Sequence, residues 1–520
     1  MSNAERDARP EQDSGSQAAG QSKKPPVLGR GASHERTMKT AGGELFYRAV
    51  ADWVVLHKRD KPIASMFYTG YFATDSDPAE RPITFVFNGG PGAASAYLHV
   101  AAVGPRRVAF AADGGVAPPP VRLVDNLETW LRFTDVVCID PVGTGFSRTH
   151  EHDEVSGSAP GGAAGGAAAG AGAASEKPKP SQFWEVKRDL ESIGEVVSRI
   201  LTTYGRWTSP VAVAGESYGG FRVARLARTL QEDVGVGLVA AILISPGIEL
   251  GALLGSDYDL DHWVEIFPAM AATAHIHGRA GKDVSQAEHR TRAEDFAMSD
   301  WVMLLAQGER MPAARRAEIC QRAGELIGLP AGLLDQAMGR LPREQFCREL
   351  LRGERRYIGM YDGSITSIDP FPDRPMYAGP DVTLQGLTRA FAAGINAHLR
   401  QDLGVDTELD YLLLNMEANA AWRDTGMEHF IAQTAGSMDH LRYGMALNPD
   451  IRVLISHGFY DLVTPYSSAD RLVRLMKLTD EQKAQVKTEH FAGGHMFYTH
   501  DESRRRFVDV VRRFCFERER

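Results

Sequence analysis

The chain has 520 residues, of which 43% are hydrophobic and 24% charged, so a folded globular protein with a sizeable core is expected. Its net charge of -9 argues against a nucleic-acid partner, because phosphate binding needs a basic surface. No apolar run reaches the roughly 18 to 20 residues that a membrane span needs, so no membrane partner is expected either.

The N-terminal residues 1–40 are polar and are predicted to form a disordered tail. They lack the apolar core of a secretory signal, which favours a cytoplasmic protein. The cysteines are too sparse for a disulfide framework and are expected to be free thiols. If the chain is exported instead, two of them could pair, Cys320 with Cys347.

The first strands are predicted in the N-terminal quarter of the chain. Two β-rich runs, Glu44–Leu56 and Pro62–Phe72, flank the polar His57–Lys61 and predict an antiparallel hairpin. A fully apolar strand, Ile83–Phe87, then ends in Asn88-Gly-Gly-Pro-Gly92. The alternative reading of this cluster is a simple turn, but at the carboxyl end of such a strand a glycine-rich loop can aim backbone N–H groups into a site. A phosphate-binding loop is excluded because no Gly-Lys-Ser/Thr follows.

A second strand of this kind, Phe133–Asp140, ends in another glycine-bearing loop, Pro141–Ser147. Both loops are therefore expected at the same edge of a parallel sheet. Residues 155–180 are rich in Gly and Ala and are predicted to be a flexible insertion without a catalytic role. Apolar residues at helical spacing then predict a helix over Phe183–Tyr204.

A serine lies at the next junction between strand and helix. Val211–Ala214 reads as a buried strand, and helical spacing begins directly after Ser217. Gly215 and Gly219 flank this serine in the pattern G-x-S-x-G, and their missing Cβ atoms let neighbouring chains approach the turn. The alternative reading is a glycine-rich turn in an ordinary parallel-sheet protein. The strand before, the helix after and suitable partners downstream favour the nucleophile of an α/β-hydrolase.

After a further strand, Leu238–Ile244, strand signals nearly vanish until about residue 448. Helical patterns fill the interval and predict a helical cap over the site; they cover Ala293–Gln307, Ala313–Ile327, Ala331–Met338, Arg343–Arg352 and Leu384–Leu399. The sheet resumes with two strands, Ile451–Ser456 and Val486–Phe491, and a terminal helix is predicted over Asp501–Phe516.

The predicted fold is therefore an α/β-hydrolase with a mostly parallel central sheet and an inserted helical cap. Residues 41–248 would form the first part of the core, 249–448 the mainly helical cap and 449–520 the second part of the core. The sequence gives no indication of the oligomeric state.

Candidate partners for the serine lie one loop beyond each late strand, at Asp461 and His495. The chain order Ser, Asp, His is the one expected for this fold. A serine hydroxyl is a weak nucleophile until a neutral imidazole takes its proton, and a carboxylate then fixes and stabilises that imidazole. His457 and Asp140 are the alternatives, but His495 follows the last strand in a Gly-Gly-His context and Asp140 precedes the serine.

Two histidine pairs offer possible metal ligands, His275-Ile-His277 and His150-Glu-His152. Neither has a third ligand at a recognised spacing, so no metal site is predicted. The expected chemistry needs no cofactor.

The motifs together resemble those of the serine carboxypeptidases, peptidase family S10, and of its bacterial branch in particular. The resemblance rests on Asn88–Ser95, Ile139–Ser147, Gly215–Gly220 and Gly494–Met496, and it covers about residues 44–515 outside the insertion. It implies a serine-type exopeptidase that releases C-terminal residues from a peptide substrate through an acyl-enzyme.

The resemblance also implies roles for individual residues. Ser217, Asp461 and His495 match the catalytic triad of the family, and the backbone N–H groups of Gly90 and Tyr218 match its oxyanion hole.

By the same match, Asn88 and Glu216 resemble the pair that holds the terminal carboxylate of the substrate. Like charges at hydrogen-bond distance cannot both ionise, so Glu216 is expected to share a proton with that carboxylate. The alternative is an ordinary buried or salt-bridged glutamate.

The chain also departs from the family. Eukaryotic members carry Cys where Ala93 stands, together with disulfides that this sequence lacks, and members are mostly vacuolar or secreted. Export is therefore the alternative to a cytoplasmic location. Two other functions stay open: a carboxylesterase or acyltransferase using the same triad, and a non-catalytic binding protein on a hydrolase fold.

Overall fold

The computed structural model describes residues 28–40, 42–150, 180–374, 379–424 and 436–517. Within these ranges no helix combines the length and the apolar character that a membrane span requires. The predicted Gly/Ala-rich insertion lies almost entirely outside the described residues.

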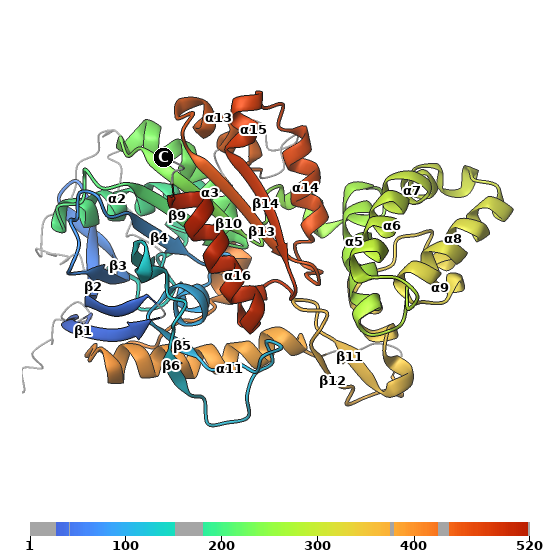
Figure 1. Ribbon diagram of the computed structural model, residues 1–520, viewed down its shortest axis with the longest axis horizontal. Coiled ribbons are helices and arrows are strands. Elements are labelled where there is room, and N and C mark those ends of the chain that lie inside the picture. Colours follow the sequence, from blue (N-terminus) through green and yellow to red (C-terminus); the bar gives the residue numbers. More distant parts are fainter. Residues whose placement is uncertain (1–27, 41, 151–179, 375–378, 425–435, 518–520) are drawn as a thin grey trace, which may run out of the picture.

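A ten-stranded sheet crosses the described part of the chain in the order β1-β2-β3-β7-β4-β9-β10-β13-β14, with β8 beside β3 (Figure 1). Its strands are β1 (Ala32–Thr40), β2 (Gly43–Lys58), β3 (Lys61–Ala73), β4 (Ile83–Phe87), β7 (Asp135–Ile139), β8 (Arg148–Thr149), β9 (Val211–Glu216), β10 (Leu238–Ile244), β13 (Arg452–Gly458) and β14 (Val486–Phe491). Pairing is antiparallel from β1 to β7 and parallel from β7 to β14. This mostly parallel sheet, with a helix after the serine strand, confirms the predicted α/β-hydrolase fold.

The prediction of a disordered tail up to residue 40 is wrong for its last part, because β1 pairs with β2 over its full length. The strand lies at the edge of the sheet, and Met38 is its one buried side chain. Backbone hydrogen bonding rather than burial forms this strand, so it shows little of the apolar pattern by which strands are predicted.

The connection between β2 and β3 is also shorter than predicted. The strands pair as far as Lys58 and Lys61, and only Arg59 and Asp60 form the turn. Both turn residues have positive φ, at 48° and 66°, as two-residue hairpin turns require.

Helices cover both faces of the sheet (Figure 1). One face packs against α2 (Val186–Thr203), α3 (Tyr218–Thr229), α13 (Met438–Leu447) and α14 (Tyr466–Leu475). The other packs against α1 (Ala96–Leu98) with the π-helical turn His99–Val103, α11 (Val382–Asn396) and α16 (Asp501–Val511). The sheet is thus buried between two apolar layers, which explains its nearly continuous hydrophobic strands.

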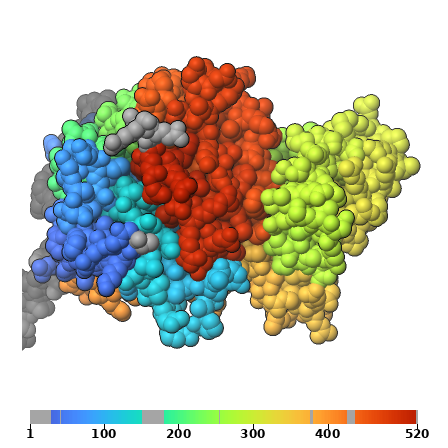
Figure 2. Space-filling view, viewed as in Figure 1, coloured from blue at the N-terminus to red at the C-terminus, as the bar shows by residue number. Residues whose placement is uncertain are grey.

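A helical lobe between β10 and β13 has a hydrophobic cluster of its own. The lobe extends sideways from the sheet and adjoins the C-terminal part of the chain (Figures 1 and 2). Its helices are α5 (Asp261–Ile276), α6 (Gln286–Phe296), α7 (Val302–Gln307), α8 (Ala313–Ile327), α9 (Ala331–Gln336) and α10 (Arg343–Glu349). The short helix α4 (Leu250–Leu254) leads into it.

The predicted cap, residues 249–448, is not one body in the structure. Its later helices α11 and α13 leave the lobe and pack on opposite faces of the sheet, through Phe391 on one side and Leu441 on the other. Short strands β11 (Arg356–Ile358) and β12 (Thr366–Ile368) pair in the same insertion, where strand signals are weak. Two further short strands, β5 (Arg106–Val108) and β6 (Leu123–Asp125), pair near α11.

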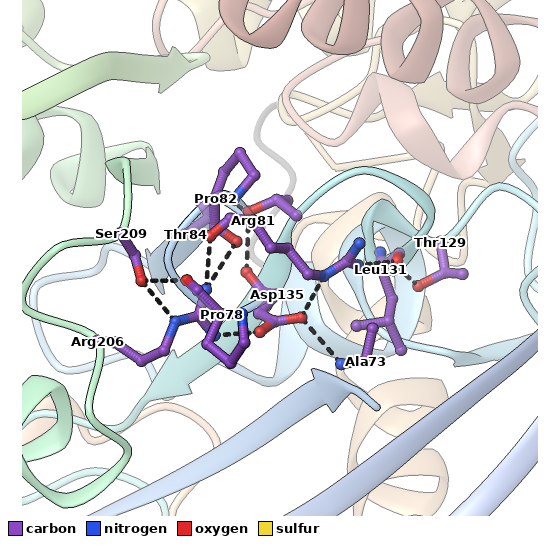
Figure 3. Close-up of polar contacts among 11 residues, drawn as sticks. Ala73, Pro78, Arg81, Pro82, Thr84, Thr129, Leu131, Asp135, Arg206 and Ser209 are labelled. Atoms are coloured by element: carbon purple, nitrogen blue, oxygen red, sulfur yellow. Dashed lines mark hydrogen bonds and ion pairs between the residues drawn. The ribbon is translucent and has the colours of Figure 1, made fainter. Parts of the chain in front are cut away.

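A buried ion cluster joins the amino end of β7 to the carboxyl end of the antiparallel β3 (Figure 3). Asp135, at the start of β7, accepts hydrogen bonds from the backbone N–H of Ala73 at 2.9 Å and from Arg81 Nε at 2.6 Å. Its other oxygen pairs with Arg206, and the Asp135 and Arg206 side chains are only 2% and 3% exposed. The cluster joins β3, β7 and the loops before β4 and β9, at the edge opposite the glycine-bearing loops.

All four cysteines, Cys138, Cys320, Cys347 and Cys515, are free and buried in the structure. Cys320 and Cys347 both contribute to the cluster of the helical lobe without being bonded to each other.

Candidate active site

The backbone turns sharply at Ser217, between β9 and α3. Ser217 has φ 59° and ψ -123°, a left-handed conformation that residues with a side chain rarely adopt. It is the N-cap residue of α3, yet its side chain makes no capping hydrogen bond. The hydroxyl is thus left for other chemistry at the N-terminus of a helix.

The flanking glycines fit this turn for a steric reason. A Cβ on Gly215 would lie 2.1 Å from the carbonyl oxygen of Gly219, and one on Gly219 would lie 2.8 Å from that of Phe87. The missing Cβ atoms therefore allow the close approach of neighbouring backbone that the sequence pattern predicts.

The loop after β4 lies directly against the same turn. A Cβ on Gly89 would lie 2.5 Å from the backbone nitrogen of Tyr218 and 2.8 Å from the Cβ of Ser217. Gly90 follows with φ 97°. Gly89 thus lies next to the first N–H group of α3, and the oxyanion site of Gly90 and Tyr218 stays a prediction.

Replacing Gly89 by alanine is expected to abolish hydrolysis. The added methyl group would clash with backbone atoms of Tyr218 and Glu216, which cannot rotate away, so the loop would move off the serine. Turnover of an ester substrate, compared with that of Gly353→Ala, checks this, because a Cβ on Gly353 meets nothing within 4 Å. Equal activity of the two variants would contradict the packing described.

His495 and Asp461 form a buried pair. His495 Nδ1 lies 2.7 Å from Asp461 Oδ2, and neither side chain is more than 3% exposed. The other oxygen of Asp461 accepts the backbone N–H groups of Val463 and Thr464, which fixes the carboxylate. This bond places the proton of neutral His495 on Nδ1 and leaves Nε2 as the basic nitrogen.

The backbone of His495 is held as well. Ser245 Oγ donates to its carbonyl oxygen at 2.7 Å, and its N–H donates to the carbonyl of Tyr361 at 2.6 Å. Burial alone would lower the pKa of His495, but the charge and hydrogen bond of Asp461, with the charge of Glu216, outweigh it and raise that pKa above its usual value.

His457 and Asp140, the alternatives for the base and the acid, make other contacts. His457 is fully buried, with Nδ1 3.2 Å from the carbonyl of Thr464, and burial lowers its pKa to about 4. Asp140 accepts hydrogen bonds from the backbone and side chain of Ser95, and burial raises its pKa to about 6. Asp461, rather than Asp140, is thus the acid bonded to His495.

Glu216 is buried beside the serine and is held at both carboxyl oxygens. The side-chain amide of Asn88 donates to Oε2, and the Tyr498 hydroxyl donates to Oε1 at 2.9 Å. The Asn88 oxygen in turn accepts the N–H of Leu98 at 3.0 Å, so the amide is fixed with its NH₂ toward Glu216. Burial raises the pKa of Glu216 to about 7, against the opposing effects of His495, Tyr498 and Asn88. The predicted pair Asn88 and Glu216 is therefore in contact, and Glu216 has no cationic partner among its hydrogen bonds.

One pocket brings most of the predicted residues together, with a cavity volume of about 70 Å³. Its lining comes from several segments: Asn88, Gly89, Gly90, Ala93, Tyr97, Glu216, Ser217, Tyr361, Leu384, Leu414, His495 and Met496. Asp461 lies behind His495. Tyr218 is not among the lining residues, and its buried hydroxyl accepts from Trp422. The predicted cap lines the pocket through Tyr361, Leu384 and Leu414, not through helices α5 to α9.

Three histidines of the two pairs lie in the described part of the chain and bond to other protein groups, whereas His152 lies outside it. His275 and His277 bond to the backbone carbonyls of Val284 and Gly363, and His150 bonds to the hydroxyl of Ser65. Among the described residues no three His, Cys, Asp or Glu side chains are grouped to hold a metal ion.

Two residues of the site escape the sequence analysis. Thr464 Oγ1 donates to Asp461 at 2.7 Å and lies 3.0 Å from His495 Nδ1, and Tyr498 donates to Glu216. Each stands three residues after a predicted site residue. That spacing is the only signal in the sequence that could have pointed to them.

Comparison with known proteins supports the family resemblance over part of the chain. The family model described as serine carboxypeptidase matches residues 48–237, which confirms the resemblance over this stretch, from β2 to the loop before β10. A search of curated proteins gave no match. The matched stretch includes Asn88, Gly90, Glu216, Ser217 and Tyr218 but ends before Asp461 and His495.

Solved structures resemble the chain only weakly. Proline iminopeptidase of Mycobacterium smegmatis is 15% identical over 89% of this chain and 97% of its own, with a TM-score of 0.35. A putative aryl esterase from Burkholderia cenocepacia is 10% identical over 93% and 100%, with a TM-score of 0.34. These likenesses carry no argument about activity. The α/β-hydrolase fold and the serine carboxypeptidase match over residues 48–237 together support a serine hydrolase.

Proposed function

We propose that the protein is a serine-type carboxypeptidase, which releases C-terminal residues from peptides through an acyl-enzyme. Ser217 would attack the last peptide carbonyl while His495, oriented by Asp461, takes its proton. The N–H groups of Gly90 and Tyr218 would stabilise the oxyanion that forms. His495 would then return the proton to the leaving amine, and water would release the acyl group by the same route.

The observation that carries this proposal is the position and chemistry of Glu216. It precedes Ser217 in the chain, lies in the same pocket and bonds to Asn88 rather than to a cation. A carboxyl whose pKa is raised to about 7 is largely protonated at slightly acid pH and can donate that proton to a substrate carboxylate. A site for an uncharged ester has no use for such an acid.

This proposal predicts how KM depends on pH. A substrate α-carboxyl ionises near ~3.5, so below pH 7 a protonated Glu216 faces a substrate carboxylate. Above pH 7 both groups are charged and repel each other, and KM for a free-carboxylate peptide is expected to rise about tenfold per pH unit. The KM of the matching C-terminal amide, which lacks the charge, should stay nearly flat.

Catalysis itself has the opposite dependence. The neutral form of His495 is required, and because its pKa is raised, kcat is expected to fall for both substrates as pH drops through that pKa. Since Glu216 and His495 each act on the pKa of the other, the two groups titrate as a coupled pair.

The test is KM and kcat against pH for one peptide and its amide, with mass spectrometry to identify the released residue. Glu216→Gln keeps a hydrogen-bonding group without the titration and should flatten the KM profile of the peptide. Parallel KM profiles for peptide and amide in the unmodified protein would reject the carboxylate-binding role and favour an esterase.

A further inference from the structure

Tyr498 contacts Glu216 but has no part in the mechanism above. It lies in the 3₁₀ turn Phe497–Thr499, directly after the loop that carries His495. Its hydroxyl donates to Glu216 Oε1 at 2.9 Å. Tyr498 is fully buried, and burial raises its pKa far above the usual value, so the phenol stays neutral. It is absent from the pocket lining, and Glu216 is the lining residue to which its hydroxyl donates.

We propose that Tyr498 is a positioning residue, which orients the Glu216 carboxyl and sets the pH range over which the site accepts a substrate carboxylate. The inference rests on the proposed function, because it assigns a determinant of the same carboxylate site.

The first argument is geometric. The two donors on Glu216 come from different elements, Asn88 from the loop after β4 and Tyr498 from the turn after β14. Because they bond to different oxygens, they fix the plane of the carboxyl group. Each oxygen keeps a further lone pair for a proton shared with a ligand.

The second argument concerns protonation. A hydroxyl that donates to a carboxyl group stabilises its ionised form more than its neutral form. Tyr498 therefore opposes the effect of burial and keeps the pKa of Glu216 from rising further. Without this hydroxyl, Glu216 should stay protonated to higher pH.

Tyr97 provides a matched control. Its ring lines the pocket and its hydroxyl is buried. That hydroxyl makes no hydrogen bond of normal geometry within the described residues, and Thr388 is the nearby hydroxyl that influences its pKa. Tyr97→Phe thus removes the same group from the same site without removing a donor to Glu216.

The first measurement needs no substrate. The carboxyl stretching band of Glu216 can be followed against pH by infrared difference spectroscopy, with Glu216→Gln as the reference. Tyr498→Phe should raise the midpoint by about one unit, the size expected for one hydrogen bond to a charged group. Tyr97→Phe should leave the midpoint unchanged. A midpoint in Tyr498→Phe equal to that of the unmodified protein would overturn the inference.

The second measurement uses KM of the peptide and of its amide. In Tyr498→Phe the rise of the peptide's KM should move to higher pH by the same shift, with the amide unaffected. The double variant Glu216→Gln/Tyr498→Phe should match Glu216→Gln alone. If the added Tyr498→Phe changed KM in that background, Tyr498 would be a general structural residue and the inference would fail.

The two proposals can fail separately. Parallel KM profiles for peptide and amide in the unmodified protein would reject the carboxypeptidase assignment. An unshifted infrared midpoint in Tyr498→Phe would reject the role of Tyr498 even where those profiles diverge as expected.

Discussion

Replacing Ser217 by alanine is expected to lower kcat by about 10⁴- to 10⁶-fold while the protein stays folded, because the covalent route is lost. In the unmodified protein the Ser217 hydroxyl makes no capping hydrogen bond, so its removal should hardly change the stability of α3. Ester hydrolysis and labelling by a fluorophosphonate probe measure the loss, and circular dichroism checks the fold. Retained hydrolysis in this variant would move the chemistry to another residue.

The histidines provide the control for this result. His495→Ala should reduce kcat by a similar order, since the base that activates Ser217 is lost. His457→Asn retains an N–H near the carbonyl of Thr464. Its turnover per folded molecule should stay within about tenfold of that of the unmodified protein, a smaller loss than removal of a general base causes. Because His457 is fully buried, its replacement should affect stability before activity. The reverse ranking of the two variants would assign the base to His457.

Replacing Asp135 by asparagine is expected to lower the free energy of unfolding by about 3 to 5 kcal/mol. The change leaves the buried Arg206 and the neighbouring Arg81 without their shared counter-ion, and the one oxygen that remains can occupy only one of the two carboxylate positions (Figure 3). A charge left unpaired away from water costs far more than an ion pair on the surface contributes. Chemical denaturation followed by tryptophan fluorescence measures the difference.

An exposed ion pair serves as the comparison. Glu288 and Arg292 are four residues apart on α6, and both side chains are 52% exposed. Glu288→Gln should therefore change the free energy of unfolding by less than about 0.5 kcal/mol. Similar losses in the two variants would mean that burial of the Asp135 cluster has no energetic consequence.

The sequence predicts the central sheet well because its parallel strands are buried on both faces. Runs such as Ile83–Phe87 and Leu238–Ile244 match β4 and β10 residue for residue. Such strands are almost continuously apolar or end at glycine-bearing loops, so local pattern and tertiary environment agree. The loops at their carboxyl ends then identify the edge of the sheet at which polar residues gather.

Elements formed by tertiary contacts are missed. The edge strand β1 is mostly exposed, and α5 is the opposite case, a helix with nearly every residue buried from His262 to Ala274 and Pro268 inside it. Neither element shows an amphipathic period, because β1 is exposed on most residues and α5 is buried on all sides. The partners that hold site residues from behind, Thr464 and Tyr498, depend on contacts that no local pattern encodes.

The predicted cap shows the same limit in another form. Helical periodicity identifies α8, which begins at Ala313 and ends at Ile327 as predicted. Helical periodicity does not say against which other elements a helix packs. For that reason the sequence misplaces α11, which packs on the sheet rather than in the lobe. Of the residues that line the pocket from this insertion, Tyr361 and Leu414 lie in loops and Leu384 lies in the first turn of α11.

The hydrophobic cluster of the helical lobe includes two residues from outside the lobe, Leu462 and Tyr466, on the segment that begins with Asp461. The backbone of this segment is also tied to the lobe side, because Leu462 donates to the carbonyl of Met360 at 3.1 Å. Partial opening of the lobe would therefore disturb the acid that orients His495 even if the sheet stayed intact. As temperature or denaturant increases, turnover should then be lost when the first of the two bodies opens. An activity assay would thereby detect local unfolding of a lobe whose helices α5 to α9 do not line the pocket.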